Sequence, residues 1–224
     1  MNLLAIETSS EACSVAVSVD GTVSDDHRVE ARAHTRTLMP MIHGLLSNAG
    51  IPADELDAVV LGNGPGSFIG MRIGASVAQG IAHAAGLRIV PVSSLAALAA
   101  EAISAHGARR VVVAQDARMG EVYVGRYEAD DRGLPVLLGD EQIVAVGRVD
   151  GITEGFAAAG AAWQRYPALA ESHADVGLCL LPLEFPKAKE LLRLASLSTG
   201  NAAGVGPADL VPAYLRTKVA DAPR

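Results

Sequence analysis

The beginning of the chain alternates apolar and polar positions in a way that predicts a β-meander. Residues 2–7 and 12–19 are rich in Val, Ile and Ala, and the polar stretch TSSEA separates them, which predicts a hairpin. Residues 22–30 follow the dipeptide DG and are expected to add a third antiparallel strand. The first structural unit is therefore expected to be all-β.

The next segment has the spacing of an amphipathic helix that ends at Gly50. Because Pro40 has no backbone N–H to donate, the regular helix is expected to start within the preceding turn or to bend there. Its apolar side chains recur at intervals of three and four residues, which is the period of one helix face. These side chains are Leu38, Met41, Ile42, Leu45, Leu46 and Ala49.

Short apolar runs then alternate with helical patterns. We expect strands in DAVVLG (57–62) and RIVPV (88–92), and helices over 71–85 and 95–104. Ser67 precedes the first of these helices and is expected to cap it. The resulting order, βββαβαβα, is typical of an α/β fold.

The opening pattern recurs in the second half. LLAIETSSEACSVAV and VVVAQDARMGEVYVGRY both run from an apolar strand through an acidic residue and a polar turn to an alternating strand. Asp116 then stands in the place of Glu7. A chance likeness of two hairpins is the alternative, because few hairpin types exist. The recurrence favours a duplicated α/β architecture, followed by a helix in FPKAKELLRLASLSTG and an extended tail from residue 204.

The composition limits the classes of function. The net charge of −7 and an aromatic content of 4% argue against a surface that grips nucleic acid by itself. Cys13 and Cys179 form no disulfide framework or metal motif. The chain begins without the basic region of a signal peptide, and no apolar run has the length of about 20 residues that spans a bilayer. We expect a cytoplasmic protein.

The stretch GNGPGSFIGMRIG, residues 62–74, has the appearance of a phosphate loop but not its chemistry. A Walker loop requires a Lys after its last glycine, and a Rossmann loop requires Gly-x-Gly-x-x-Gly after the first strand and a later ribose-binding acid. The glycines instead recur every fourth residue and form a smooth helix face. That face is expected to allow close approach, either of the protein's own sheet or of a partner. The stripe consists of Gly66, Gly70, Gly74, Ala78 and Ala82.

Catalytic motifs are missing from the sequence. No two His residues lie three or four apart, so no helix presents a His pair to a metal, and no Gly-x-Ser-x-Gly motif occurs. Glu7 and Asp116 end strands before polar turns, where actin-like ATPases place the acids that hold Mg-nucleotide. An ordinary hairpin turn explains the same pattern.

Several motifs together resemble the TsaB (YeaZ) family of bacterial tRNA-modification proteins. They are LLAIETSSEACSVAV, HTRTLMPMI, GNGPGSFIGMRIGASVAQGIA, DARMGEVYV and PAYLR, with Ile69 where the family usually has Thr. The resemblance implies an actin-like ATPase fold (ASKHA, ribonuclease H-like) of two subdomains with mixed sheets flanked by helices. Residues 1–105 would form the N-terminal subdomain, which carries the partner surface. Residues 106–224 would form a more divergent one, whose last helix packs back on the first.

The resemblance also implies a non-catalytic subunit. The related transferase TsaD carries a metal-binding His-x3-His after the corresponding PV strand, whereas this chain has Ser94 and Leu98 at those positions. Ser and Leu do not replace imidazole at a metal. We therefore expect neither a catalytic nor a metal site, and no tightly bound cofactor. ATP or ADP is expected at most at an interface with partners.

By the same resemblance, the chain helps to transfer threonylcarbamoyl to N6 of adenosine 37 in tRNAs that read ANN codons. It would bind TsaD and, with it, the ATPase TsaE, or form a homodimer, and would reach tRNA only through the complex. Burial on its own sheet is the alternative for the two helix faces. The expected interface residues are Leu38, Met41, Ile42, Leu45, Gly70, Arg72, Ile73, Gly74, Val77 and Ile81.

A rival hypothesis is a free-standing actin-like ATPase or sugar kinase that uses Glu7 and Asp116. On the family reading the same turns are vestigial nucleotide-facing positions. These positions are Glu7, Thr8, Ser9 and Asp116.

Overall fold

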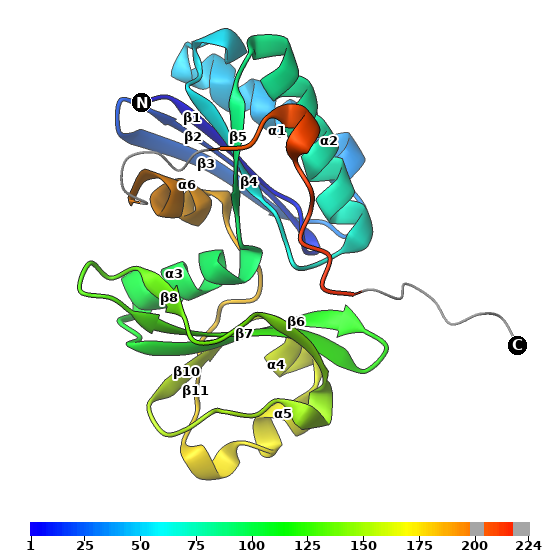
Figure 1. Cartoon of the computed structure of the whole chain (residues 1–224), viewed down its shortest axis with the longest axis vertical. Helices are drawn as coiled ribbons and strands as arrows, with labels where there is room; N and C mark the ends of the chain where they lie inside the picture. Colours follow the sequence, from blue (N-terminus) through cyan, green and yellow to red (C-terminus); the bar gives the residue numbers. More distant parts are fainter. Residues whose placement is uncertain (198–203, 217–224) are drawn as a thin grey trace, which may run out of the picture.

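The computed structural model describes residues 1–197 and 204–216, and in these ranges it shows two lobes arranged along the long axis of the molecule (Figure 1). Each lobe is a mixed β-sheet with helices against it. The predicted α/β class is thus confirmed. Residues 198–200 of the predicted last helix and residues 217–224 of the predicted tail lie outside the described residues.

The first sheet has the order β3-β2-β1-β4-β5. Its first three strands pair antiparallel, whereas β4 and β5 run parallel to β1 and to each other. Each strand predicted in this part of the chain is present. The strands are β1 (Leu3–Glu7), β2 (Ala12–Val19), β3 (Thr22–Val29), β4 (Ala58–Gly62) and β5 (Arg88–Val92).

Helices cover both faces of this sheet. Side chains alternate along a strand, so Leu4 and Ile6 of β1 contact α1 (His34–Ala49) and α2 (Phe68–Ala85), which lie on one face. Leu3 and Ala5 contact α6 (Ala188–Leu197), which lies on the other. A strand buried on both faces explains why β1 is apolar throughout.

The ends of three helices differ from those predicted. α1 begins at His34, more than a full turn before Pro40, so a start within the turn before Pro40 is wrong, and a bend at Pro40 stays a prediction. The ring of Pro40 lies on the exposed side of the helix, where water can reach the carbonyl that loses its partner. α2 starts at Phe68 because the Ser67 hydroxyl accepts a hydrogen bond from the N–H of Gly70 at 3.2 Å, which confirms the predicted cap. α3 extends from Ser94 to His106 and is capped by Ser93.

The second sheet repeats the first. Its order is β8-β7-β6-β10-β11, and again the first three strands pair antiparallel and the last two run parallel to the third. This match in order and direction supports the predicted duplication over a chance likeness of hairpins. The strands are β6 (Arg110–Arg118), β7 (Glu121–Ala129), β8 (Pro135–Leu137), β9 (Gln142–Ala145, paired with β7), β10 (Phe156–Ala159) and β11 (Cys179–Leu180).

Two helices, α3 and α6, each pack on the sheet that the other half of the chain forms. Leu95 and Leu98 of α3 lie in the core of the second lobe with Val111 and Val113 of β6. In contrast, α6 follows the second sheet in the chain but packs on the first. The short helices α4 (Ala162–Arg165) and α5 (Pro167–Glu171) cover the other face of the second sheet. A division at residue 105 stays a prediction, and the packing crosses that point in both directions.

The described part of the tail runs along the first lobe, and the expectation of an extended tail is wrong at η4 (Pro207–Asp209), which is a short 3-10 helix. The backbones of Val205 and Ile89 exchange hydrogen bonds of 3.0 and 2.8 Å, and Leu210 is buried in the core of that lobe. From there residues 211–216 run toward the β6–β7 hairpin (Figure 1). The tail therefore contacts elements of both halves of the chain.

The helix cap gives a first prediction. We expect Ser67→Ala to lower the free energy of unfolding by about 0.5–2 kcal/mol, because the N–H of Gly70 loses its acceptor. Ser76→Ala, at an exposed position inside the same helix, is the matched control and should be neutral or slightly stabilising. Urea unfolding followed by circular dichroism measures both. Equal effects of the two substitutions would contradict the cap.

Candidate functional site

The turns of the two equivalent hairpins, where nucleotide-facing residues were expected, lie close together, since Arg118 of one turn forms an ion pair with Glu11 of the other. Glu7 forms the last ladder pair of its hairpin, with Ser14, and Asp116 the last pair before a register shift, with Val122. Each carboxylate accepts a hydrogen bond from the N–H two residues later, at 2.6 Å from Ser9 and at 2.8 Å from Arg118. The two acids are thus equivalent in local structure, but their surroundings differ.

Glu7 is enclosed by the protein. Its side chain is fully buried and accepts a hydrogen bond of 2.6 Å from the hydroxyl of Ser94 at the start of α3. A Cβ atom on Gly62 would overlap with the carboxylate, so glycine at this position leaves the space that Glu7 fills. Burial raises the pKa of the Glu7 carboxyl, and hydrogen bonds from Ser94 and Ser9 offset part of this effect. The expectation that Glu7 faces a nucleotide is therefore wrong for this conformation.

The turn after Glu7 packs against the glycine stripe of α2. A Cβ on Gly70 would overlap with the carbonyl oxygen of Thr8, and one on Gly66 with that of Ser9. The Thr8 hydroxyl also donates to the carbonyl of Gly70 at 2.9 Å, and the N–H of Ser67 to that of Ser9 at 2.6 Å. Thr8 and Ser9 are buried by these contacts, so they do not face a ligand either.

The glycine stripe is consequently an internal surface. A Cβ on Gly74 would overlap with the hydroxyl of Thr8, and Ala78 and Ala82 are fully buried. Gly70 and Gly74 were expected to receive a partner, and the structure corrects this. The smooth face of α2 lets a turn of the same chain approach to backbone distance.

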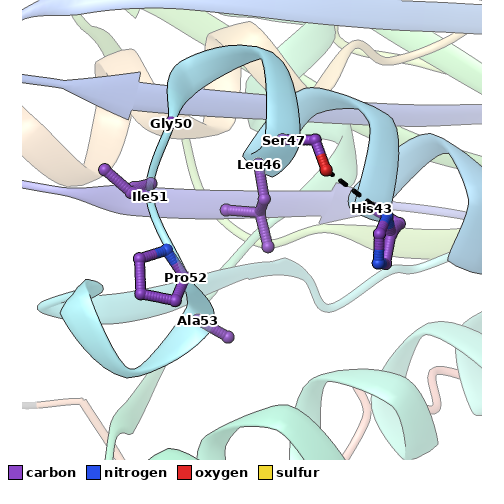
Figure 2. Close-up of a pocket in the computed structure, with 7 residues that line it drawn as sticks. All are labelled: His43, Leu46, Ser47, Gly50, Ile51, Pro52 and Ala53. Carbon is purple, nitrogen blue, oxygen red and sulfur yellow. Dashed lines mark hydrogen bonds between the residues drawn. The ribbon is translucent and has the colours of Figure 1, made fainter.

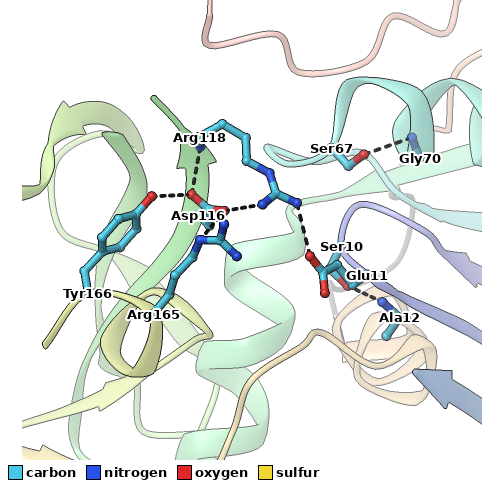
Figure 3. A network of polar contacts seen from close by, with 9 residues as sticks. All are labelled: Ser10, Glu11, Ala12, Ser67, Gly70, Asp116, Arg118, Arg165 and Tyr166. Carbon is cyan, nitrogen blue, oxygen red and sulfur yellow. Dashed lines mark hydrogen bonds and ion pairs between the residues drawn. The ribbon is translucent and has the colours of Figure 1, made fainter. Parts of the chain in front are cut away.

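Asp116 lies in a network of polar contacts (Figure 3). It forms ion pairs with Arg118 at 3.1 Å and with Arg165 at 3.0 Å, and it accepts a hydrogen bond from the Tyr166 hydroxyl at 2.8 Å. Arg118 also reaches Glu11 of the other hairpin turn at 3.1 Å. The side chain of Asp116 is 12% exposed, and these groups occupy both of its oxygens. Sequence reasoning found Asp116 but missed its partners, because Arg165 at the end of α4 and Tyr166 directly after it are distant in the chain.

The positions that the family resemblance singled out on α3 have structural roles. Ser94 binds Glu7 and accepts a hydrogen bond from the N–H of Gly64 at 3.2 Å, whereas Leu98 is fully buried in the second lobe. Within residues 1–197 and 204–216, no three His, Cys, Asp or Glu side chains gather in a way that suits a metal ion.

The apolar stripe of α1 faces the protein's own core. Leu38, Met41 and Ile42 are at most 2% exposed, and Leu45 is 8% exposed. They pack against β1, β2 and β4, so they are not open to a partner. This corrects the expectation for these four residues. One apolar face cannot contact the sheet and a second protein at the same time.

The remaining expected interface residues lie toward the outside of α2. Arg72 is exposed, and its guanidinium lies 3.7 Å from the centre of the Phe68 ring. Ile73, Val77 and Ile81 are half-buried at the edge of the core. Ile69 was not selected from the sequence, although it is 70% exposed. Its spacing of four residues from Ile73 places it on the same side of the helix and could have identified it.

The end of α1 carries a shallow depression of about 480 Å³ (Figure 2). The ring of His43 lies 3.5 Å from the hydroxyl of Ser47, and the other lining side chains are apolar. A ligand site normally brings several polar groups together, and this one does not. The lining consists of His43, Leu46, Ser47, Gly50, Ile51, Pro52 and Ala53.

Within residues 1–197 and 204–216, no helix is both long and apolar enough to cross a bilayer.

The glycine contacts give a second prediction. We expect Gly70→Ala to destabilise the protein by about 1–3 kcal/mol, because the new methyl group meets a backbone carbonyl that has little freedom to move. Gly80 lies in the same helix with open space around its Cβ direction, so Gly80→Ala should stabilise by about 0.5–1 kcal/mol. Urea unfolding followed by the fluorescence of Trp163, the single Trp of the chain, measures both. A stabilising Gly70→Ala would refute the packing described here.

Glu7 gives a third prediction, which concerns pH. Burial raises its pKa in the folded state above the ordinary value of 4.5. The folded state then binds the proton more tightly than the unfolded chain does, so this contribution to stability is present below pH 4.5 and is lost as the pH rises through the folded-state pKa. Glu7→Gln should gain stability relative to the wild type by about 1.4 kcal/mol per pH unit within that window.

The controls for Glu7 follow from its contacts. Other groups with shifted pKa, such as His27 and Glu190, affect both proteins equally, so the difference isolates Glu7. Glu7→Ala should instead destabilise at every pH, by about 1–3 kcal/mol or more, because Ser94 and Ser9 lose a buried acceptor. Unfolding curves in urea from pH 4 to pH 8 test this, and parallel pH profiles for wild type and Glu7→Gln would show that the pKa is not raised.

Comparison with known proteins gives consistent matches over most of the chain. A family model described as TsaD, tRNA N6-adenosine threonylcarbamoyltransferase, matches residues 27–201. The tRNA threonylcarbamoyladenosine biosynthesis protein TsaB of Escherichia coli is 36% identical over 228 residues, which cover 98% of this chain and 96% of that protein. The TsaB protein of Bacillus subtilis is 32% identical over 145 residues, which cover 64% of this chain and 62% of that protein.

Solved structures agree with these matches. YeaZ from Pseudomonas aeruginosa superimposes with a TM-score of 0.84 at 36% identity, covering 96% of this chain and 99% of that one. A second structure, described as an uncharacterized protein with similarity to peptidase YEAZ from Pseudomonas aeruginosa, has a TM-score of 0.85 at the same identity and coverage.

Proposed function

This chain belongs to the TsaB (YeaZ) family, and on that basis we propose that it is a non-catalytic partner subunit in the synthesis of threonylcarbamoyladenosine on tRNA. Its relatives bear the name tRNA threonylcarbamoyladenosine biosynthesis protein. The role of partner goes further than that name. This role is supported by the positions of Ser94 and Leu98 in α3 and of the acids in the two hairpin turns.

One observation carries the proposal. The positions that correspond to the metal-binding histidines of TsaD hold Ser94 and Leu98, and both side chains point into the protein. Ser94 binds the buried carboxylate of Glu7, and Leu98 is fully buried in the second lobe. A chain with these two residues inside its own packing lacks the donors for that metal, so it contributes by binding.

The contacts of the two hairpin turns also argue against the rival hypothesis of an ATPase. Both of its acids are engaged: Glu7 is buried, and Asp116 is paired with two arginines and a tyrosine. A carboxylate that orients hydrated Mg²⁺ needs free oxygens toward solvent. We do not propose this activity.

The partner in this proposal is the TsaD relative of the same cell, with TsaE joining the pair. The contact surface is the outer side of α1 and α2, where Met39 of α1 is 50% exposed and Ile69 of α2 is 70% exposed, with the exposed Arg72 three residues after Ile69. Exposed apolar side chains next to an arginine are typical of interface centres. A second copy of the chain would use the same surface when TsaD is absent, and ATP or ADP would bind only at such an interface.

The net charge fits a role in which other subunits hold the tRNA. At −7, the chain repels a polyanion unless a partner supplies the basic contacts. The proposal thus places it in the cytoplasm, within a complex that carries the tRNA.

The experiment combines depletion with one surface substitution. Cells depleted of this protein should lose threonylcarbamoyladenosine from hydrolysed tRNA, as measured by mass spectrometry, and the wild-type gene should restore it. Unchanged levels after depletion would refute the function.

The surface is tested separately by binding. Ile69→Glu should weaken co-purification with the TsaD relative by about 10-fold to 100-fold, since it places a charge among apolar contacts. Val23→Glu, at a 49% exposed position on the edge strand β3, is the matched control and should bind normally. Normal binding by Ile69→Glu would show that the interface lies elsewhere on the protein. It would not contradict the proposed function.

A further inference from the structure

We propose that residues 204–216 form a strap that holds the two lobes at one fixed angle. This strap is a property of the isolated chain, so it does not depend on the proposed function. The segment contacts the first lobe, the second lobe and, in particular, the β6–β7 hairpin.

The strap is anchored firmly on the first lobe. Besides the backbone pairing of Val205 with Ile89, the side chain of Gln79 donates to the carbonyl of Pro207 at 2.8 Å. Asn63 binds the strap through both side chain and backbone, at 3.0 Å each. Leu210 is 6% exposed and belongs to the core of the first lobe. A segment with this many partners has a fixed path over α2 and β5.

The last two described residues of the strap bind the second lobe. Leu215 packs against the core cluster that α3 forms with β6 and β7. Arg216 donates to the carbonyl of Ala117 at 2.8 Å and forms an ion pair with Glu121 at 2.5 Å. Its side chain is 20% exposed, so this pair is partly shielded from solvent. The strap thus packs one apolar side chain against the core of each lobe, Leu210 in the first and Leu215 in the second.

The contacts of Arg216 lie on the same hairpin that carries Arg118. Arg118 leaves the β6–β7 turn toward Glu11 of the first lobe, while Arg216 binds the neighbouring Ala117 and Glu121. Arg118 and Met119 both have positive φ angles, of 65° and 57°, so the backbone of this turn is held in a conformation that side chains disfavour. The hairpin tip is therefore held from two sides by elements of the other lobe.

The position of the strap explains what it can do. The chain passes between the lobes from β5 into α3 and from β11 into α6, and lobes connected in this way can rotate about their linkers. In Figure 1 the strap (red) crosses from α2 toward the β6–β7 hairpin on the side of the molecule away from α6. Because the strap joins the two lobes at a distance from the linkers, it restricts that rotation. The lobes then present their surfaces as one rigid body.

The test measures the distance between the lobes. Spin labels on Asn48→Cys in α1 and Glu171→Cys in α5, both exposed, in a Cys179→Ser background, report it by pulsed electron resonance. Two shortened chains are compared. One ends at Arg216 and retains every contact of the strap, and the other ends at Tyr214 and loses only those with the second lobe.

We expect the chain that ends at Tyr214 to give a broader distribution with a longer mean distance than the chain that ends at Arg216. Identical distributions would overturn the proposal. If the shorter chain does not fold, Arg216→Ala and Glu121→Gln in the full chain break the same ion pair from either side and should each broaden the distribution. Unchanged distributions for both would equally overturn it.

Arg165→Ala is the matched control. Like Arg118, Arg165 pairs with Asp116, but this pair lies within the second lobe. Its removal should leave the distance unchanged, whereas Arg118→Ala, which cuts the contact with Glu11, should broaden it. A broadening of equal size in Arg165→Ala would show that loss of charge around Asp116, not loss of the tie between lobes, causes the effect.

Discussion

The close packing of the turn at residues 8–10 on the glycine face of α2 is the constraint on which the rest of the first lobe depends. Gly66, in the loop before α2, and Gly70, in its first turn, lie against the carbonyl oxygens of Ser9 and Thr8, at a separation that leaves no room for a Cβ atom. The turn then directs Glu7 inward, where Ser94 meets it. Sheet, glycine loop and the start of α3 are thus joined around one buried carboxylate, which is where the chain passes to the second lobe.

The same close packing determines which acidic side chains at the junction of the lobes are free to bind a ligand. The two hairpins are equivalent in topology, and their acids hold the same kind of backbone hydrogen bond. Glu7 is nevertheless enclosed by close packing, while Asp116 is neutralised by Arg118 and Arg165. The turns that carry these two acids therefore hold the structure of this chain together. That difference supports a role in binding for this chain, because the groups that would do chemistry are already engaged.

Much of the fold could be predicted from the sequence, whereas the location of contact surfaces could not. The strands of the first sheet, the order βββαβαβα, the recurrence of the hairpin and the cap at Ser67 follow from local patterns, and the structure confirms them, whereas β8 to β11 were not predicted. The interface residues were chosen from the same periodicity, and for Leu38 and Gly70 that choice was wrong. An apolar or smooth helix face looks alike in sequence whether it meets its own sheet or a partner.

The sequence by itself determined the elements of the first lobe, the recurrence of its hairpin and the family, because these depend on spacing along the chain and on motifs. Only the tertiary structure decided which face of each helix is covered, that α3 and α6 cross between the halves, and that residues 204–216 connect both lobes. The physical reason is that these features depend on contacts between residues far apart in the chain. Arg216 and Glu121, for example, share no local pattern, and folding alone brings them together.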